Sequence, residues 1–252
     1  MGRDDGPVTE RPAHRVRMSR PFAIAKYETP QNLYQAVMGT NPSRWKGPRN
    51  AAEMMTWHEA RTFCERITRI LRDRKLIAAD EHIRLPTEAE WEYCCRAGTT
   101  TLYSFGDSAQ NDGDVGPKAG ILDRYAWHTG NAAGNDPPVG ALRPNKWGLF
   151  DMHGYLWEMT EDDWFPDYAT GPSDDRPRKR RSERTDQANA PKAVNRSADP
   201  SSRRITIRGG SWRDRFDRLT STARTAFPID ARSDAVGFRC VRSRRPPSRR
   251  TP

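Results

Sequence analysis

No hydrophobic period is sustained between residues 98 and 148 of this 252-residue chain. Glycine, asparagine, aspartate and proline recur through 106–148 with aromatic residues scattered among them, which is typical of loops rather than of helices or strands. Irregular chain of this length inside a compact domain needs something to hold it, and the ordinary candidates are buried aromatic side chains, a bound cation or a disulfide. The sequence therefore predicts a domain in which a large share of the backbone is irregular.

Regular elements are expected on either side of this stretch. Apolar residues in 56–76 follow the spacing of one helical face, and Thr87 followed by Glu90 is a capping box that opens a helix through Cys95. A further helix is expected to begin at Thr29-Pro30, because proline favours the first turn. Short strands are expected near 22–26, 204–207 and 236–241.

The positive charge of the chain is concentrated in two segments rich in proline, serine and arginine. Of the net formal charge of +10, residues 176–204 contribute +7 and residues 241–252 contribute +5, so everything else is near −2. Such charge blocks are usually solvated. We therefore expect one domain over 14–242, with a flexible basic insertion at about 171–203 and a disordered basic tail over 243–252. Binding of polyanions stays open as an alternative, but nucleic acid is not expected as the main partner, because no basic face interleaved with aromatic residues accompanies these segments.

The sequence carries no sign of a membrane anchor or of an export signal. No run approaches the roughly 18 apolar residues of a membrane-spanning helix. The first twenty residues are polar and mixed in charge, without the apolar centre of a secretory signal. A cytoplasmic location is the default expectation.

Five separated stretches occur in the order that one family shows. They read HRVRMSRPFAIAKYETPQNLYQAVMGTNPSRWKG (14–47), RLPTEAEWEYCCRAGTT (84–100), PNKWGLFDMHGYLWEMTEDDW (144–164), IRGGSW (207–212) and VGFRCVR (236–242). With them the chain resembles the formylglycine-generating enzyme, or sulfatase-modifying factor, superfamily over nearly everything outside the insertion and the tail. The resemblance implies an α+β fold of the C-type-lectin-like kind, loop-rich and poor in regular secondary structure.

The resemblance also implies a chemistry that this chain is not equipped to perform. The founding activity of the family is oxidation of a sulfatase cysteine to formylglycine, with Cu(I) held by two cysteine thiolates just after the RGGS motif. Here Asp214 stands at the first thiolate position and Leu219 or a neighbour near the second, and neither replaces a soft sulfur ligand. Copper is therefore not expected. Iron-dependent relatives use histidine ligands, but the five histidines form no pair at metal-ligand spacing; only His128 and His153, both within motif stretches, are candidates to approach each other in the fold.

Calcium is the metal that the motifs favour. Carried over by resemblance, the calcium site of the family would use the side chains of Asp151 and Glu158 and the backbone oxygens of Gly154 and Leu156. Oxygen ligands on an irregular loop suit this hard cation. The alternative is that both carboxylates only cap turns and pair with nearby arginines.

Two of the four cysteines match a structural disulfide of the secreted eukaryotic enzyme. By this resemblance Cys95 and Cys240 are the disulfide candidates, and the alternative is two reduced, buried thiols. Cys64 is expected to pack as a small apolar residue on its helix.

The remaining candidates line the groove beside the lost copper position. By resemblance these are Trp157, Ser211 and Trp212, with Asp214 on the same loop; the two tryptophans could equally be core residues. The sequence therefore favours a family member without copper chemistry that acts as a binding or accessory module for a peptide or small molecule. The alternatives are an oxidoreductase of the same superfamily, acting with a different metal or with residual formylglycine-generating activity, and a polyanion-binding protein.

Overall fold

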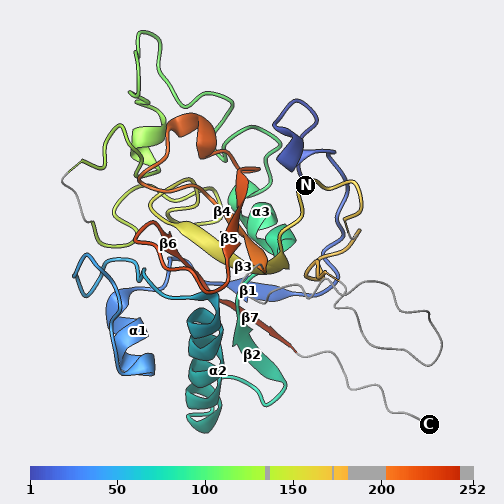
Figure 1. The fold of residues 1–252 in the computed structure, drawn as a ribbon, viewed down its shortest axis with the longest axis vertical. Coiled ribbons are helices and arrows are strands. Elements are labelled where there is room, and N and C mark those ends of the chain that lie inside the picture. The colour runs from blue at the N-terminus through green and yellow to red at the C-terminus, as the bar shows by residue number, and fades with distance from the viewer. Residues whose placement is uncertain (134–136, 172, 181–202, 245–252) are drawn as a thin grey trace, which may run out of the picture.

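The computed structural model describes residues 1–252 except 134–136, 172, 181–202 and 245–252. Regular structure is sparse and lies mainly outside the aperiodic stretch (Figure 1). The α-helices are α1 (Gln31–Met38), α2 (Trp57–Asp73) and α3 (Glu88–Arg96). The strands are β1 (Phe22–Ile24), β2 (Glu81–Arg84), β3 (Trp157–Asp163), β4 (Arg204–Arg208), β5 (Arg224–Pro228), β6 (Val236–Gly237) and β7 (Val241–Arg244). Single 3-10 turns occupy Val8–Glu10, Leu122–Arg124 and Phe216–Arg218.

The strands form two small sheets. One has the order β1-β7-β2, and its pairs are antiparallel. The other has the order β5-β4-β3-β6; its β5-β4 and β4-β3 pairs are antiparallel, whereas β3 and β6 run parallel. This α+β arrangement confirms the fold class that the motifs implied.

Helix starts follow the local sequence signals closely. Thr56 caps α2 and Thr87 caps α3, each in a complete capping box with the glutamate three residues later. The expected strand at 236–241 divides into two, because β6 pairs with β3 in one sheet and β7 joins β1 and β2 in the other. The intervening Phe238 is fully buried, so the chain crosses between the sheets through the core.

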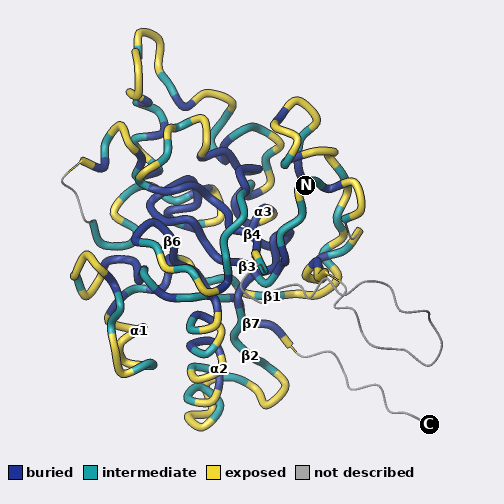
Figure 2. Tube along the Cα trace, viewed as in Figure 1, coloured by how far each residue is buried: buried dark blue, intermediate teal, exposed yellow. Residues whose placement is uncertain are grey.

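The irregular stretch is held by its own aromatic cluster. Phe105 stacks between Tyr103 and Tyr125, with ring centroids 5.1 Å and 4.4 Å apart, and Leu122 is fully buried beside Tyr103 in the same cluster. Outside this cluster most described residues of 98–148 are exposed or half-buried, as the yellow and teal loops of Figure 2 show. Of the three means of holding such a loop, buried aromatic side chains are therefore in use.

The ends of the domain differ from the boundaries expected from sequence. Residues 1–10 pack on the domain: Gly2 N–H donates to Glu92 (2.9 Å) and Thr222 donates to Glu10 (2.6 Å). Residues 173–180, counted within the expected insertion, also join it, because Arg178 is buried and its N–H donates to Asp162 (2.6 Å). Most of the expected insertion and the tail, residues 181–202 and 245–252, lie outside the described residues.

In the described part of the chain, none of the helices combines the length and the apolar character that a bilayer crossing needs.

Candidate functional site

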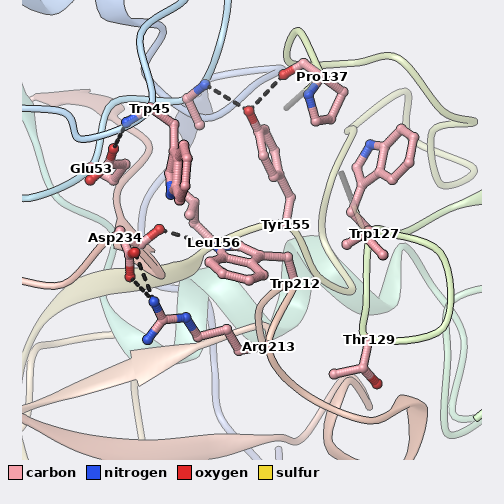
Figure 3. Close-up of a pocket in the computed structure, with 13 residues that line it drawn as sticks. Trp45, Glu53, Trp127, Thr129, Pro137, Tyr155, Leu156, Trp212, Arg213 and Asp234 are labelled. Carbon is pink, nitrogen blue, oxygen red and sulfur yellow. Dashed lines mark hydrogen bonds and ion pairs between the residues drawn. The ribbon is translucent and has the colours of Figure 1, made fainter. Parts of the chain in front are cut away.

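A cleft of about 600 Å³ opens among the loops that follow α1 and the aperiodic stretch (Figure 3). Its walls are mainly aromatic, and the four rings come from four separate segments: Trp45, Trp127, Tyr155 and Trp212. Volume and lining are those of a small-molecule or peptide site. None of the ring contacts found among the described residues joins two of these four side chains.

Tyr155 organises this cleft through both its backbone and its side chain. Its N–H donates to the carbonyl of Trp127 (3.0 Å), and its own carbonyl accepts from Trp212 N–H (2.9 Å). The hydroxyl donates to Pro137 O (2.6 Å) and accepts from Ala51 N–H (3.2 Å). Tyr155 also has a positive φ of 79°, a conformation that is costly for a residue with a side chain and is enriched at functional sites.

Gly154 lets the preceding turn approach the cleft wall. At its φ of 151° a Cβ atom would lie 2.5 Å from the carbonyl oxygen of Trp127 and 2.6 Å from Leu219. Only glycine fits at this position, so the expected calcium-site glycine has a packing role that its sequence position did not reveal.

Charged groups gather at one side of the cleft. The carboxylate of Asp234 pairs with Arg213 (2.6 Å) and with Arg44 (3.2 Å). Each arginine stacks on its neighbouring tryptophan, Arg213 4.7 Å above Trp212 and Arg44 4.9 Å above Trp45. Both guanidinium groups are at least half exposed, whereas Asp234 is buried.

One donor in the wall has no partner in the structure. The indole nitrogen of Trp127 is buried and makes no hydrogen bond. In Figure 3 the edge of the ring that carries this nitrogen turns toward Tyr155. An unpaired buried donor is unfavourable, and an acceptor on a ligand would relieve that cost.

Of the four expected groove residues, only Trp212 lines the cleft. The other three lie behind it in one hydrogen-bonded unit, in which Asp214 Oδ2 accepts from Trp157 Nε1 (2.8 Å) and from Ser211 Oγ (2.7 Å) and N (3.0 Å). The carboxylate at the expected thiolate position is thus engaged in holding the loop. Leu219, near the second position, is fully buried in the cluster that holds the aperiodic stretch.

Of the two carboxylates expected to bind calcium, Glu158 is engaged by an arginine, whereas Asp151 keeps one oxygen without a hydrogen-bond partner. Both oxygens of Glu158 bind the guanidinium of Arg239 at 2.7 Å, and Oε2 also accepts from Trp91 Nε1. Leu156 N–H donates to Glu28 Oε1 (3.1 Å). Asp151 Oδ2 accepts from Gly140 N–H (2.7 Å). The arginine pairing that was the alternative for these carboxylates therefore holds for Glu158 but not for Asp151.

Two buried oxygens nearby have no partner: Asp151 Oδ1 and Glu28 Oε2. Burial raises the pKa of Asp151 to about 6. Burial, together with the negative charges of Glu158 and Asp151, raises the pKa of Glu28 well above its ordinary value. Glu28 is the member of this group that sequence reasoning missed, although it stands in a matching motif, KYETP. The described residues contain no group of three His, Cys, Asp or Glu side chains arranged to hold a metal, so backbone oxygens would have to complete any shell here.

The predicted Cys95–Cys240 disulfide is wrong in the structure. All four cysteines are free, and the neighbour of Cys240 is Cys64, with the two sulfur atoms 3.9 Å apart. Cys95 lies in a different cluster, where its Sγ contacts Met152 O (3.4 Å) and the ring of His153. The pairing differs because α2, rather than α3, presents its apolar face to the strand that follows Cys240.

The two candidate histidines do not pair with each other. His128 Nε2 bonds Asp123 (2.7 Å), whereas His153 Nδ1 donates to Leu219 O (2.9 Å) and its Nε2 accepts from Ser104 N–H (3.0 Å). Both are buried and satisfied, as core histidines are.

Sequence reasoning also missed most of the cleft itself. Trp45 and Trp127 were visible as aromatic residues in motif stretches, in SRWKG and YAWHTGN, but nothing local indicated that they face Trp212 across one cavity. Asp234 and Glu53 carried no motif signal.

Comparisons with known proteins agree with the fold. The chain belongs to the family of sulfatase-modifying factor enzyme 1-like domains, whose family model matches residues 1–244. It is 32% identical to the formylglycine-generating enzyme of Mycobacterium tuberculosis over 163 residues, which is 63% of this chain and 50% of that enzyme. It is 27% identical to the inactive Cα-formylglycine-generating enzyme 2 of Bos taurus over 198 residues, 74% of this chain and 48% of that protein. The chain thus spans about half the length of these relatives.

Solved structures show the same fold. The structure of PvdO from Pseudomonas aeruginosa superposes with a TM-score of 0.74 at 24% identity, covering 96% of this chain and 89% of that one. Treponema denticola variable protein 1 superposes with a TM-score of 0.73 at 25% identity, covering 95% and 90%.

Proposed function

We propose that this protein is a ligand-binding member of the family, which takes a peptide or small molecule into the aromatic cleft and does not form formylglycine with copper. The observation that carries the proposal is an open aromatic cleft beside a loop in which Asp214 and Leu219 occupy the positions expected for thiolates. A carboxylate already holding Ser211 and Trp157 is a poor ligand for soft Cu(I). Without the thiolate pair, the cleft would keep a binding role while lacking the ligands that the copper chemistry needs.

Relatives of different activity support this proposal. The bovine relative is named an inactive formylglycine-generating enzyme, and a further relative, 29% identical over 175 residues, is named chaperone protein LppX of Paenibacillus barcinonensis. Membership of the family therefore does not by itself imply oxidation of a substrate cysteine.

The lack of copper chemistry is tested with a cysteine peptide that carries the CxPxR motif. The peptide is incubated with protein, copper and a thiol reductant, and the aldehyde product is measured by mass spectrometry beside an active formylglycine-generating enzyme. We expect no turnover above the protein-free control. Turnover, or copper or iron retained at one atom per chain through purification, would favour the oxidoreductase alternative instead.

The binding role is tested with a matched pair of tryptophan variants. Trp45 and Trp147 are each 46% exposed, but only Trp45 lines the cleft. Peptides and small molecules are screened by ligand-observed NMR against wild type, Trp45→Ala and Trp147→Ala. Ligands of the cleft should lose binding with Trp45→Ala and keep it with Trp147→Ala. If every ligand found is insensitive to Trp45→Ala, the cleft is not the binding site.

We also propose that a structural Ca²⁺ binds beside the cleft, held by Asp151 and Glu28 rather than by Asp151 and Glu158. Both residues bury a carboxylate oxygen that has no partner, and a divalent cation would neutralise the charge that burial makes unfavourable. Glu158 is already neutralised by Arg239 and is not needed in the shell. The ion would supply charge neutralisation only, and it would hold the turn that carries Tyr155.

A further inference from the structure

We propose that the cleft recognises a trimethylammonium group whose molecule also carries an anion, such as a choline phosphate. This inference rests on the proposed binding role of the cleft and names the class of its ligand. The aromatic residues would enclose the cation, and the arginines at the edge of the cleft would meet the anion.

The aromatic walls favour a cation. Three indoles and one phenol face the same space, and the tryptophan ring attracts cations most strongly among aromatic side chains. The rings of Trp45 and Trp212 already each carry a guanidinium group at 4.9 Å and 4.7 Å, which shows that their faces accept positive charge. Enclosure of quaternary ammonium groups by several aromatic residues is a recurring use of this interaction.

The hydrogen-bonding state of the walls favours a quaternary over a primary ammonium. The Tyr155 hydroxyl is engaged with Pro137 O and Ala51 N–H, the carbonyl of Asp234 accepts from Trp212 Nε1, and the Asp234 carboxylate is shared by two arginines. A primary ammonium would bring three N–H donors toward these engaged acceptors, with Glu53 as the other carboxylate in the wall, so part of its lost hydration would not be replaced. A trimethylammonium group carries no N–H donors, so it gives up fewer hydrogen bonds to water when it enters the cleft.

The charged side chains of the cleft are arranged to suit a ligand with one positive and one negative group. Glu53, a buried carboxylate in the wall, accepts from Trp45 N–H (3.0 Å) and places negative charge next to that ring. Arg44 and Arg213 share the single carboxylate of Asp234, so one positive charge is in excess at the exposed edge. Cation inside and anion outside is therefore the favoured orientation.

The test compares phosphocholine with its uncharged-carbon analogue, 3,3-dimethylbutyl phosphate, by isothermal titration calorimetry on the full chain. The two probes share shape and anion and differ only in the positive charge. Phosphocholine should bind at least roughly tenfold more tightly, which corresponds to about one desolvated cation–π interaction. Equal affinities, or no binding of phosphocholine, would overturn the proposal. Phosphoethanolamine should bind more weakly than phosphocholine, and the reverse order would also overturn it.

Variants separate this proposal from the broader one. Trp45→Phe should retain much of the affinity for phosphocholine and Trp45→Ala should lose it, while Trp147→Ala has no effect. Arg213→Gln should weaken phosphocholine but leave choline unchanged, because only the former has an anion to meet. If a ligand of another class binds and is lost with Trp45→Ala while phosphocholine never binds, the cleft is a binding site but the trimethylammonium assignment is wrong.

A further arm identifies the source of the group. Sedimentation of the protein with phosphatidylcholine vesicles, but not with phosphatidylglycerol vesicles, would identify a lipid headgroup. Binding of free phosphocholine without vesicle association would identify a soluble ligand. Failure of both arms overturns the proposal.

Discussion

At the scale of single residues, buried arginines hold carbonyl oxygens of the irregular loops. An irregular loop leaves carbonyl oxygens without partners, and these need donors when they are buried. Arg208 donates to the carbonyls of Ser221, Thr222 and Ala223 and pairs with Glu92 (2.6 Å). Arg239 donates to Phe150 O (2.8 Å) while it neutralises Glu158. The five N–H donors of a guanidinium group suit it to hold several loop segments at once.

His153 gives the stability of the protein a dependence on pH that can be measured. Its burial lowers the pKa of the imidazole to about 4, against about 6.5 in an unfolded chain. As pH falls, the unfolded state therefore takes up the proton before the folded state does. The contribution of neutral His153 to the free energy of unfolding is fully present above about pH 6.5 and is lost as pH falls toward 4. The loss is at most about 3 kcal/mol.

Urea unfolding between pH 4 and 7 tests this expectation. His153→Asn should flatten the fall in unfolding free energy over that range, whatever its effect on absolute stability. His58→Gln, at an exposed position on α2, is the control and should keep the wild-type slope. An unchanged slope in His153→Asn would mean that another group is responsible.

At the scale of elements, the core joins α2 to the sheet that contains β7. Phe63 stacks on Tyr34 of α1 at 5.6 Å and meets Phe238 edge-on at 5.3 Å. Cys64 follows on the same helix and contacts Cys240, which directly precedes β7. The hydrogen bond to Cys240 and the burial of Cys64 raise the pKa of Cys64 well above its ordinary value, so this thiol is protonated at neutral pH.

We expect mild oxidation to link Cys64 to Cys240. Treatment with diamide should remove two hydrogens from the pair, and peptide mapping should find this disulfide, while Cys94 and Cys95 still react with a thiol reagent after unfolding. The bond would close a separation of 176 residues and stabilise the fold by roughly 2–5 kcal/mol. Cys64→Ser should abolish both effects, with Cys94→Ser as the control. A mapped Cys95–Cys240 bond would contradict the structure.

At the scale of the whole molecule, part of the basic charge near the expected insertion is engaged by the fold. Residues 181–202 contain four Lys and Arg against three acidic residues, so little of the excess lies there. On the flanks, Arg178 stacks 3.7 Å over Phe165 and Arg203 pairs with Asp163 at 2.7 Å. Arg176 and Arg180 are exposed, so binding of polyanions stays an alternative.

Calcium should affect the stability of the whole domain. Because an ion that binds only the folded state stabilises it by mass action, a chelator should lower the melting temperature and excess Ca²⁺ should restore it. The double variant Glu28→Gln/Asp151→Asn should lose this response, and Glu161→Gln, on the rim of another groove, should keep it. Identical melting of wild type in chelator and in millimolar Ca²⁺ would contradict the proposed site.

Features that depend on neighbouring residues or on motifs could be predicted from the sequence. Capping boxes at Thr56 and Thr87 set the helix starts, and the ordered motifs indicated the family and its loop-rich α+β fold. The absence of cysteine from the segment that follows the RGGS motif was also readable directly. Strands such as β3, with the sequence WEMTEDD, were not, because both faces of that charged segment are buried and its charges are neutralised from elsewhere in the chain.

Which distant residues meet followed only from the three-dimensional fold. The fold places Cys240 against Cys64 rather than Cys95, leaves buried carboxylate oxygens of Asp151 and Glu28 without a hydrogen-bond partner, and gathers four aromatic rings into one cleft. The physical reason is that loops carry no periodicity from which a facing direction follows. Their side chains are oriented by long-range hydrogen bonds, such as those that join Tyr155 to Trp127 and Trp212, and these form only when the whole chain has folded.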